Sequence, residues 1–134
     1  MAVTDDYQTW ARELLERAAG GDKALEAQAA ALESVMRSLT EVLVPIFGRL
    51  ALRLLLERAV QSVAPSFPFA SRIGVHEEGI DAAGITGDLA GIAPATVQEG
   101  FERLLGTFLE DLSGLVGRDL ARRLVAEAWR DGKT

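Results

Sequence analysis

The chain has 134 residues, enough for one hydrophobic core but not for two independent ones. Alanine and leucine supply 40 of these residues, a composition typical of helices. The lack of cysteine excludes disulfides, thiolate metal sites and thiol nucleophiles, and the net charge of −6 disfavours nucleic acid as a partner.

The most apolar stretch, residues 42–63, has the composition of a core helix. It is interrupted by four charged side chains, each costly in the middle of a bilayer. These are Arg49, Arg53, Glu57 and Arg58. Residues 1–20 contain no apolar run of signal-peptide length. We therefore expect a cytoplasmic protein with no membrane partner.

The first two helices are predicted from apolar spacing. Residues 7–18 place apolar side chains on one face of a helix that ends at Gly20 and Gly21. After Asp22, apolar residues recur every seven positions, which predicts a long second helix. They are Leu25, Leu32, Leu39 and Ile46. Pro45 disfavours helical geometry at Val44, so we expect a third helix to begin at the proline and to run to about Val63.

Residues 65–93 form a Gly/Pro-rich connector. Within it, residues 72–76 and 80–82 have the pattern of two short strands joined by a turn, which predicts a small hairpin. Beyond it, Pro94 is well placed to open a helix to about Leu115, and Gly117 precedes a last helix to Trp129.

An internal repeat is predicted at an offset of 69 residues. Residues 31–60 align without gaps on residues 100–129, with eight identical positions that include Gly48 and Gly117. Apolar character is also kept at eight further pairs, among them Ile46 and Leu115, so we expect a shared buried face. Each copy reads as a long helix, a break and a shorter helix, which suggests a pseudo-symmetric unit of four helices.

No motif for catalysis or metal binding emerges from the sequence. His76, Glu77, Glu78 and Asp81 cluster in the connector, but their spacing fits neither a calcium loop nor a zinc site, so we interpret them as solvated turn residues. No serine has the setting of a nucleophile elbow, and the glycines do not form a phosphate loop. We expect no catalytic residue, no metal and no cofactor.

One segment resembles part of a bacterial helix-turn-helix. Gly91, Ile92, Ala93, Thr96 and Val97 match its turn and the start of its recognition helix, and the resemblance covers residues 87–104. The first helix of the motif would be about a turn short. Positions that would face DNA are mostly acidic or neutral, with one basic residue. They are Gln98, Glu99, Glu102 and Arg103. We therefore expect no nucleic acid as partner.

Two arginine pairs recur in the repeat, Arg49 with Arg118 and Arg53 with Arg122. They could bind an anion together, but surface ion pairs with nearby glutamates are the simpler interpretation.

The two copies differ on one helix face. Leu50 and Leu54 stand where the second copy has Asp119 and Arg123, and Phe47 lies beside them. An apolar face of this kind is expected to be buried against another surface. Three surfaces could bury it: the first helix of the same chain, a second copy of the chain, or another protein.

The sequence therefore predicts a single all-α domain over residues 1–134. It has five helices, four of them in two helix-pair repeats, and a possible small hairpin. We expect a non-catalytic interaction or regulatory module that forms a homodimer or docks on a protein partner through Phe47, Leu50 and Leu54. The alternative is a helical bundle that binds a small apolar ligand or cofactor.

Overall fold

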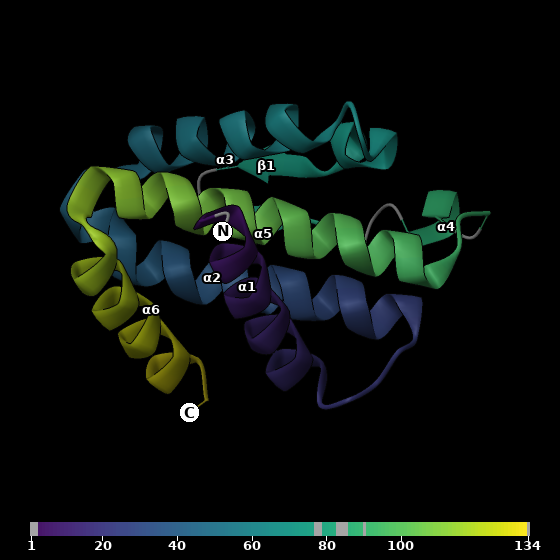
Figure 1. Cartoon of the computed structure of the whole chain (residues 1–134), viewed down its shortest axis with the longest axis horizontal. Coiled ribbons are helices and arrows are strands. Elements are labelled where there is room, and N and C mark those ends of the chain that lie inside the picture. Colours follow the sequence, from purple (N-terminus) through teal and green to yellow (C-terminus); the bar gives the residue numbers. More distant parts are fainter. Residues whose placement is uncertain (1–2, 77–78, 83–85, 90, 134) are drawn as a thin grey trace.

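A computed structural model gives the fold of the chain (Figure 1) and describes residues 3–76, 79–82, 86–89 and 91–133. In chain order the elements are α1 (Val3–Ala19), α2 (Leu25–Phe47), α3 (Arg49–Val63), the 3-10 helix η1 (Pro68–Arg72), β1 (Gly74–His76), β2 (Gly79–Asp81), α4 (Thr86–Leu89), α5 (Pro94–Val116) and α6 (Arg118–Lys133). The prediction of an all-α fold with five long helices and a small hairpin is confirmed.

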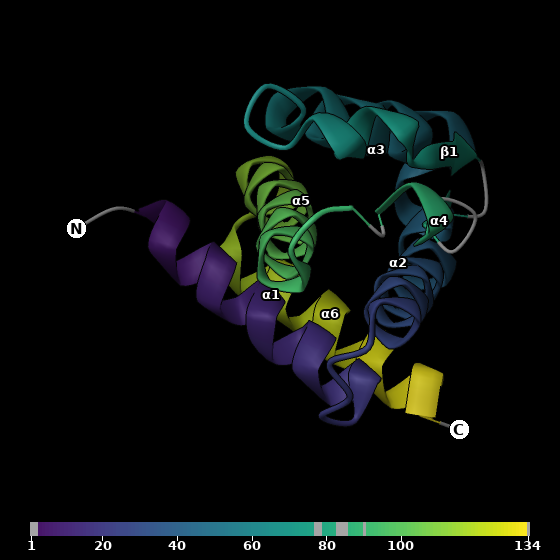
Figure 2. The ribbon, with the colours of Figure 1, turned by 90° about the vertical axis from the view of Figure 1, so that its right-hand side faces the viewer.

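The two long helices α2 and α5 run side by side in the same direction, with α3 on one side of them and α6 on the other (Figures 1 and 2). The second helix of each predicted pair packs mainly against the first helix of the other pair: α3 contacts α5, and α6 contacts α2. The core lies between these four helices and is built from leucine, valine and phenylalanine side chains.

The two helix pairs have matching bounds. α2 and α5 are both 23 residues long, and the bounds of α5 are those of α2 shifted by 69 positions. Equivalent apolar positions are buried in both pairs. They include Leu32 and Phe101, Val35 and Leu104, Met36 and Leu105, Leu39 and Phe108, Leu43 and Leu112, and Leu56 and Val125. The predicted repeat thus has a structural correlate in helix length and burial, and its origin by duplication stays a prediction.

The break between α2 and α3 lies at Gly48 and not at Pro45. The prediction that a helix begins at Pro45 is wrong, because α2 continues through the proline to Phe47. A proline in the last turn removes one helical hydrogen bond only, whereas Gly48 takes a φ of 86° that side chains disfavour and so turns the chain. We call residues 46–50 and 115–119 the two elbows.

Helix α1 packs against α5 and α2. Its backbone comes close to Gly106 of α5, where an added Cβ would lie 3.4 Å from the Cα of Gln8 and the carbonyl oxygen of Tyr7. The equivalent position in α2 is Arg37, which is exposed. Leu14 and Leu15 are buried in this packing. The interpretation of α1 as the cover of Leu50 and Leu54 is therefore wrong, since both leucines remain exposed.

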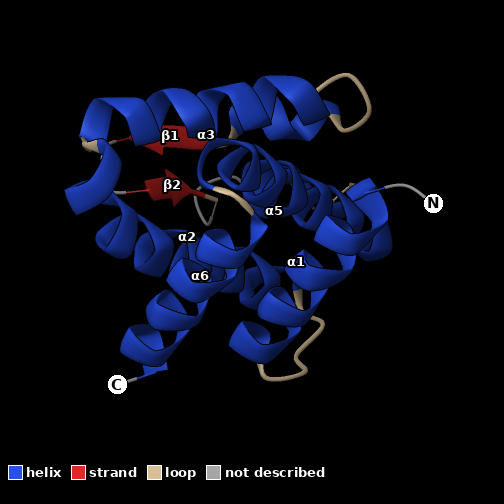
Figure 3. Ribbon diagram, turned by 60° about the vertical axis from the view of Figure 1, so that its left-hand side comes forward, coloured by secondary structure: helices blue, strands red, loops and turns tan. Residues whose placement is uncertain are grey.

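The predicted hairpin is confirmed as the antiparallel pair β1 and β2, with Val75 opposite Ile80. It lies between α2 and α3 (Figure 3), and the backbone N–H of Ala82 donates to the Glu33 carboxylate of α2 at 2.7 Å. Two short strands are marginal alone, so this anchoring to helices stabilises them. Glu77 and Glu78, which the sequence placed in the turn, lie outside the described residues.

A search of the described helices for a membrane-spanning segment found none of sufficient length and apolarity.

Candidate functional site

The elbows carry an exposed apolar surface. Among the residues that the structure describes, every large apolar side chain that is exposed belongs to an elbow or to the helix that follows it. We call these five residues the elbow surface. They are Ile46, 52% exposed, Leu50, 68%, Leu54, 55%, Leu115, 63%, and Leu120, 42%. Both elbows lie at the same end of the molecule (Figure 1).

The three residues predicted for the interface differ in exposure. Leu50 and Leu54 are open to solvent, one turn apart on α3. Phe47 is half-buried and packs against the core, so only part of its side chain is accessible to a partner. The two leucines are therefore the accessible part of the predicted set.

Sequence reasoning placed Ile46 and Leu115 on the buried face of the repeat, and this is wrong. Both are the second-to-last residue of a long helix, just before the glycine where the chain turns away. The heptad and repeat patterns identified them as apolar but carried no signal that the helix was about to end. Leu120, expected on the apolar half of the last helix, is also partly exposed.

Charged side chains flank the leucines of α3. Arg53 Nε lies 3.2 Å from Glu57 Oε2 one turn along the helix, as the surface ion-pair interpretation expected. Arg49 and Arg58 form no ion pair within the described part of the chain. The exposed leucines of α3 therefore have the Arg53–Glu57 ion pair beside them and an arginine without an ion pair towards each end.

A second feature lies between α1 and α6, where three arginines stack on aromatic rings. Arg118 lies 5.5 Å from the ring centre of Tyr7, and Arg122 lies 5.0 Å from that of Trp10. Further along, Arg17 of α1 lies 5.9 Å from the ring centre of Trp129 in α6. The recurrent Arg118 and Arg122 thus hold α1 to α6. Sequence reasoning missed this role because it did not pair the first and last helices.

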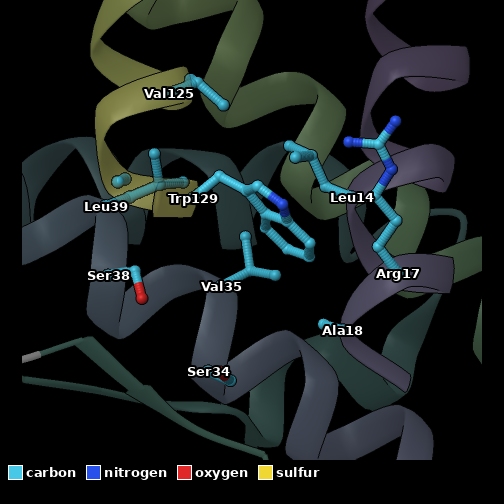
Figure 4. Close-up of a pocket in the computed structure, with 10 residues that line it drawn as sticks. Leu14, Arg17, Ala18, Ser34, Val35, Ser38, Leu39, Val125 and Trp129 are labelled. Atoms are coloured by element: carbon cyan, nitrogen blue, oxygen red, sulfur yellow. The ribbon is translucent and has the colours of Figure 1, made fainter. Parts of the chain in front are cut away.

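Behind the Arg17–Trp129 contact, α1, α2 and α6 form a cavity of about 210 Å³ that is partly open to solvent. Figure 4 shows its lining residues, with the Trp129 indole across the middle and Arg17 on the α1 side. The walls are mainly apolar and include Leu14, Val35, Leu39 and Val125. Ser34 and Ser38 of α2 add two hydroxyl groups.

The segment that resembles a helix-turn-helix is part of the core. The helix before its turn, α4, has four residues, and the helix after it, α5, buries Val97, Phe101 and Glu102. Glu102 accepts hydrogen bonds from Arg12 at 3.3 Å and from Gln98 at 3.2 Å. Glu102, which the resemblance would place towards DNA, therefore links α5 to α1 through Arg12.

The cluster expected to consist of solvated turn residues lies partly outside the described residues. Within the described ranges, no group of three or more His, Asp or Glu side chains is arranged to hold a metal ion.

Comparison of the chain with models of protein families, with curated proteins and with solved structures gave no significant match.

Proposed function

We propose that this chain is a non-catalytic helical interaction module that self-associates through the elbow surface. The observation that carries the proposal is the confinement of the exposed large apolar side chains, among described residues, to the two elbows and the helices after them. Such a surface is costly to leave in water, because full burial of each leucine is worth about 1.5–3 kcal/mol. Exposed apolar side chains gathered at one end of a monomer are typical of protein interfaces.

A second copy fits the α3 part of this surface. When two α3 helices pair antiparallel about a two-fold axis, Leu50 of each copy meets Leu54 of the other. The Arg53 side chains of the two copies then lie on the same edge, about 3 Å apart along the axis. Each is neutralised by its own Glu57, 3.2 Å away, so this edge adds little like-charge repulsion.

The same pairing brings Arg49, which has no ion pair of its own among the described residues, towards Glu57 of the other copy. On ideal helices, Arg49 of one copy lies about 3 Å along the axis from Glu57 of the other and on the same edge. Arg58 lies near the far end of each helix, opposite the region of Ile46. The charge pattern is therefore compatible with a symmetric contact between identical faces.

The double substitution Leu50→Asp with Leu54→Arg tests the proposal, because it restores the residues of the second copy of the repeat. Its control is Gln61→Arg with Ser62→Asp, which adds the same charges to exposed positions on the same helix. We expect a wild-type dimer by light scattering, a helical monomer for the leucine variant and an unchanged dimer for the control. A wild-type chain that stays monomeric at all accessible concentrations contradicts self-association.

A further inference from the structure

We propose that the cavity between α1, α2 and α6 binds a small amphipathic carboxylate. The apolar body lies inside and the carboxylate lies at Arg17. This inference is independent of self-association, since the cavity and the elbow surface have no residue in common.

The size of the cavity sets the size of the ligand. A dry cavity of about 150 Å³ holds a benzene molecule. A volume of about 210 Å³ therefore takes an apolar body of roughly eight to ten carbons. The lining of Leu14, Val35, Leu39 and Val125 suits a straight alkyl chain or one aromatic ring.

The polar groups at the cavity favour an anion. Arg17 is exposed, and within the described part of the chain it forms no ion pair, although the protein has an excess of acidic residues. Its partner there is the Trp129 ring, which orients the guanidinium and leaves its N–H groups available. A carboxylate can accept two of these N–H groups at once.

Two serines on the α2 side support the same class of ligand. Among described residues, the hydroxyls of Ser34 and Ser38 have no hydrogen-bond partner, whereas Thr40 on the same helix donates to the Met36 carbonyl at 2.8 Å. Free hydroxyls beside an apolar cavity can donate to a carboxylate or to its bound water. The site thus combines an apolar interior with donors, and none of its described lining residues is acidic.

The experiment uses octanoate as the probe and Trp129 as the reporter. The variant Trp10→Phe leaves Trp129 as the one tryptophan, so its emission reports on the cavity wall. We expect a saturable change in emission with octanoate and a rise in melting temperature, because a ligand that binds only the folded state stabilises it. Octanol should bind more weakly.

Two kinds of variant distinguish the contribution of the cavity to binding from that of the Arg17 cation. Ala18→Leu places a larger side chain in the cavity and should abolish binding, whereas Ala30→Leu, exposed on α2, should not affect it. Arg17→Gln should weaken octanoate binding about tenfold and leave octanol binding unchanged. The matched control is Arg123→Gln, exposed on α6 and outside the cavity lining.

Clear outcomes overturn the proposal. These are a lack of saturable response to octanoate or decanoate, or octanoate binding that Ala18→Leu leaves intact. Equal affinity of the wild type and Arg17→Gln also overturns it. If circular dichroism shows that Ala18→Leu is unfolded, Ser38→Leu serves as the second cavity-filling variant.

Discussion

Gly48 and Gly117, 69 residues apart, end the two long helices with the same backbone conformation. Gly48 has φ 86° and ψ 159°, and Gly117 has φ 91° and ψ 152°. Each donates its N–H to the carbonyl four residues earlier at 2.8 Å, to Val44 and Ser113 respectively. This region of φ and ψ is accessible almost only to glycine. The two elbows therefore depend on the same residue type for the same reason.

Substitution of either elbow glycine by alanine should destabilise the protein by a similar amount. We expect Gly48→Ala and Gly117→Ala each to lower the free energy of unfolding by about 1–3 kcal/mol, the cost of a strained conformation. The cause is backbone strain, because an added Cβ would meet no described atom within 4 Å at either position. Urea denaturation measures the loss. A marked difference between the two variants would argue against equivalent elbows.

The duplication itself predicts a superposition. Residues 31–60 should overlay residues 100–129 in an experimental structure, with Gly48 on Gly117 and the two pairs related by an approximate two-fold axis. The matching bounds of α2 and α5 motivate this expectation. Different crossing angles within the two helix pairs would indicate that the sequence match reflects similar amino-acid composition and not duplication.

Two glycines of α5 should respond oppositely to alanine. A Cβ at Gly100 would lie 2.5 Å from Phe69 Cζ and 3.1 Å from Phe67 Cδ1, so Gly100→Ala should cost about 1–3 kcal/mol through overpacking. A Cβ at Gly114 would meet no described atom within 4 Å. Gly114→Ala should therefore stabilise the helix by up to about 1 kcal/mol. Thermal unfolding of both variants checks the sign, and two equal losses would contradict the packing of Phe69 on α5.

The only tyrosine, Tyr7, offers a probe of the contact between α1 and the second elbow. The pKa of Tyr7 lies below its ordinary value of about 10, mainly because of the neighbouring Ser113 hydroxyl, with burial opposing and Arg118 assisting. In the range between the lowered pKa and about 10, the unfolded chain binds more protons than the folded chain, so folding stability rises with pH.

Ultraviolet titration of the phenol should therefore show ionisation at a lower pH in the folded protein than in urea. Ser113→Ala and Arg118→Gln should each raise the pKa of Tyr7 towards its ordinary value. In Tyr7→Phe, this contribution to the rise of stability with pH should be absent. A folded-state pKa at or above the urea value would show that the Ser113 hydroxyl does not reach the phenolate.

The helices and the hairpin were predictable because their signals are local. Apolar spacing determined α1 and α2, and alternation with flanking glycines determined the β1–β2 pair. Exposure at the elbows was less predictable, because it depends on where a helix ends. Ile46 continues a heptad of core residues, yet the chain turns two residues later.

The position of α1 depends on tertiary packing that apolar periodicity does not report. Its apolar face could have covered Leu50 and Leu54. The face of α5 that it occupies is distinguished by the absence of a side chain at Gly106 and by Glu102, which accepts a hydrogen bond from Arg12. The repeat held a signal for this choice, since Arg37 stands at the equivalent position of α2. The cavity at Trp129 likewise follows from the spacing of three helices, which no single segment encodes.

The arginine pairs of the repeat give the last prediction, because their two copies have different surroundings. Arg122 lies 5.0 Å from the ring centre of Trp10. Its neighbour Arg123 is exposed and stacks on no aromatic ring among the described residues. A cation over an indole at a partly exposed site is worth about 0.5–1 kcal/mol. Arg122→Gln should therefore destabilise the protein by about that amount, whereas Arg123→Gln should stay within about 0.5 kcal/mol of wild type. In a double-mutant cycle with Trp10→Leu, measured by urea denaturation, the loss from Arg122→Gln should disappear when Trp10 is absent. An unchanged loss would mean that Arg122 acts through the surface of α6 and not through α1.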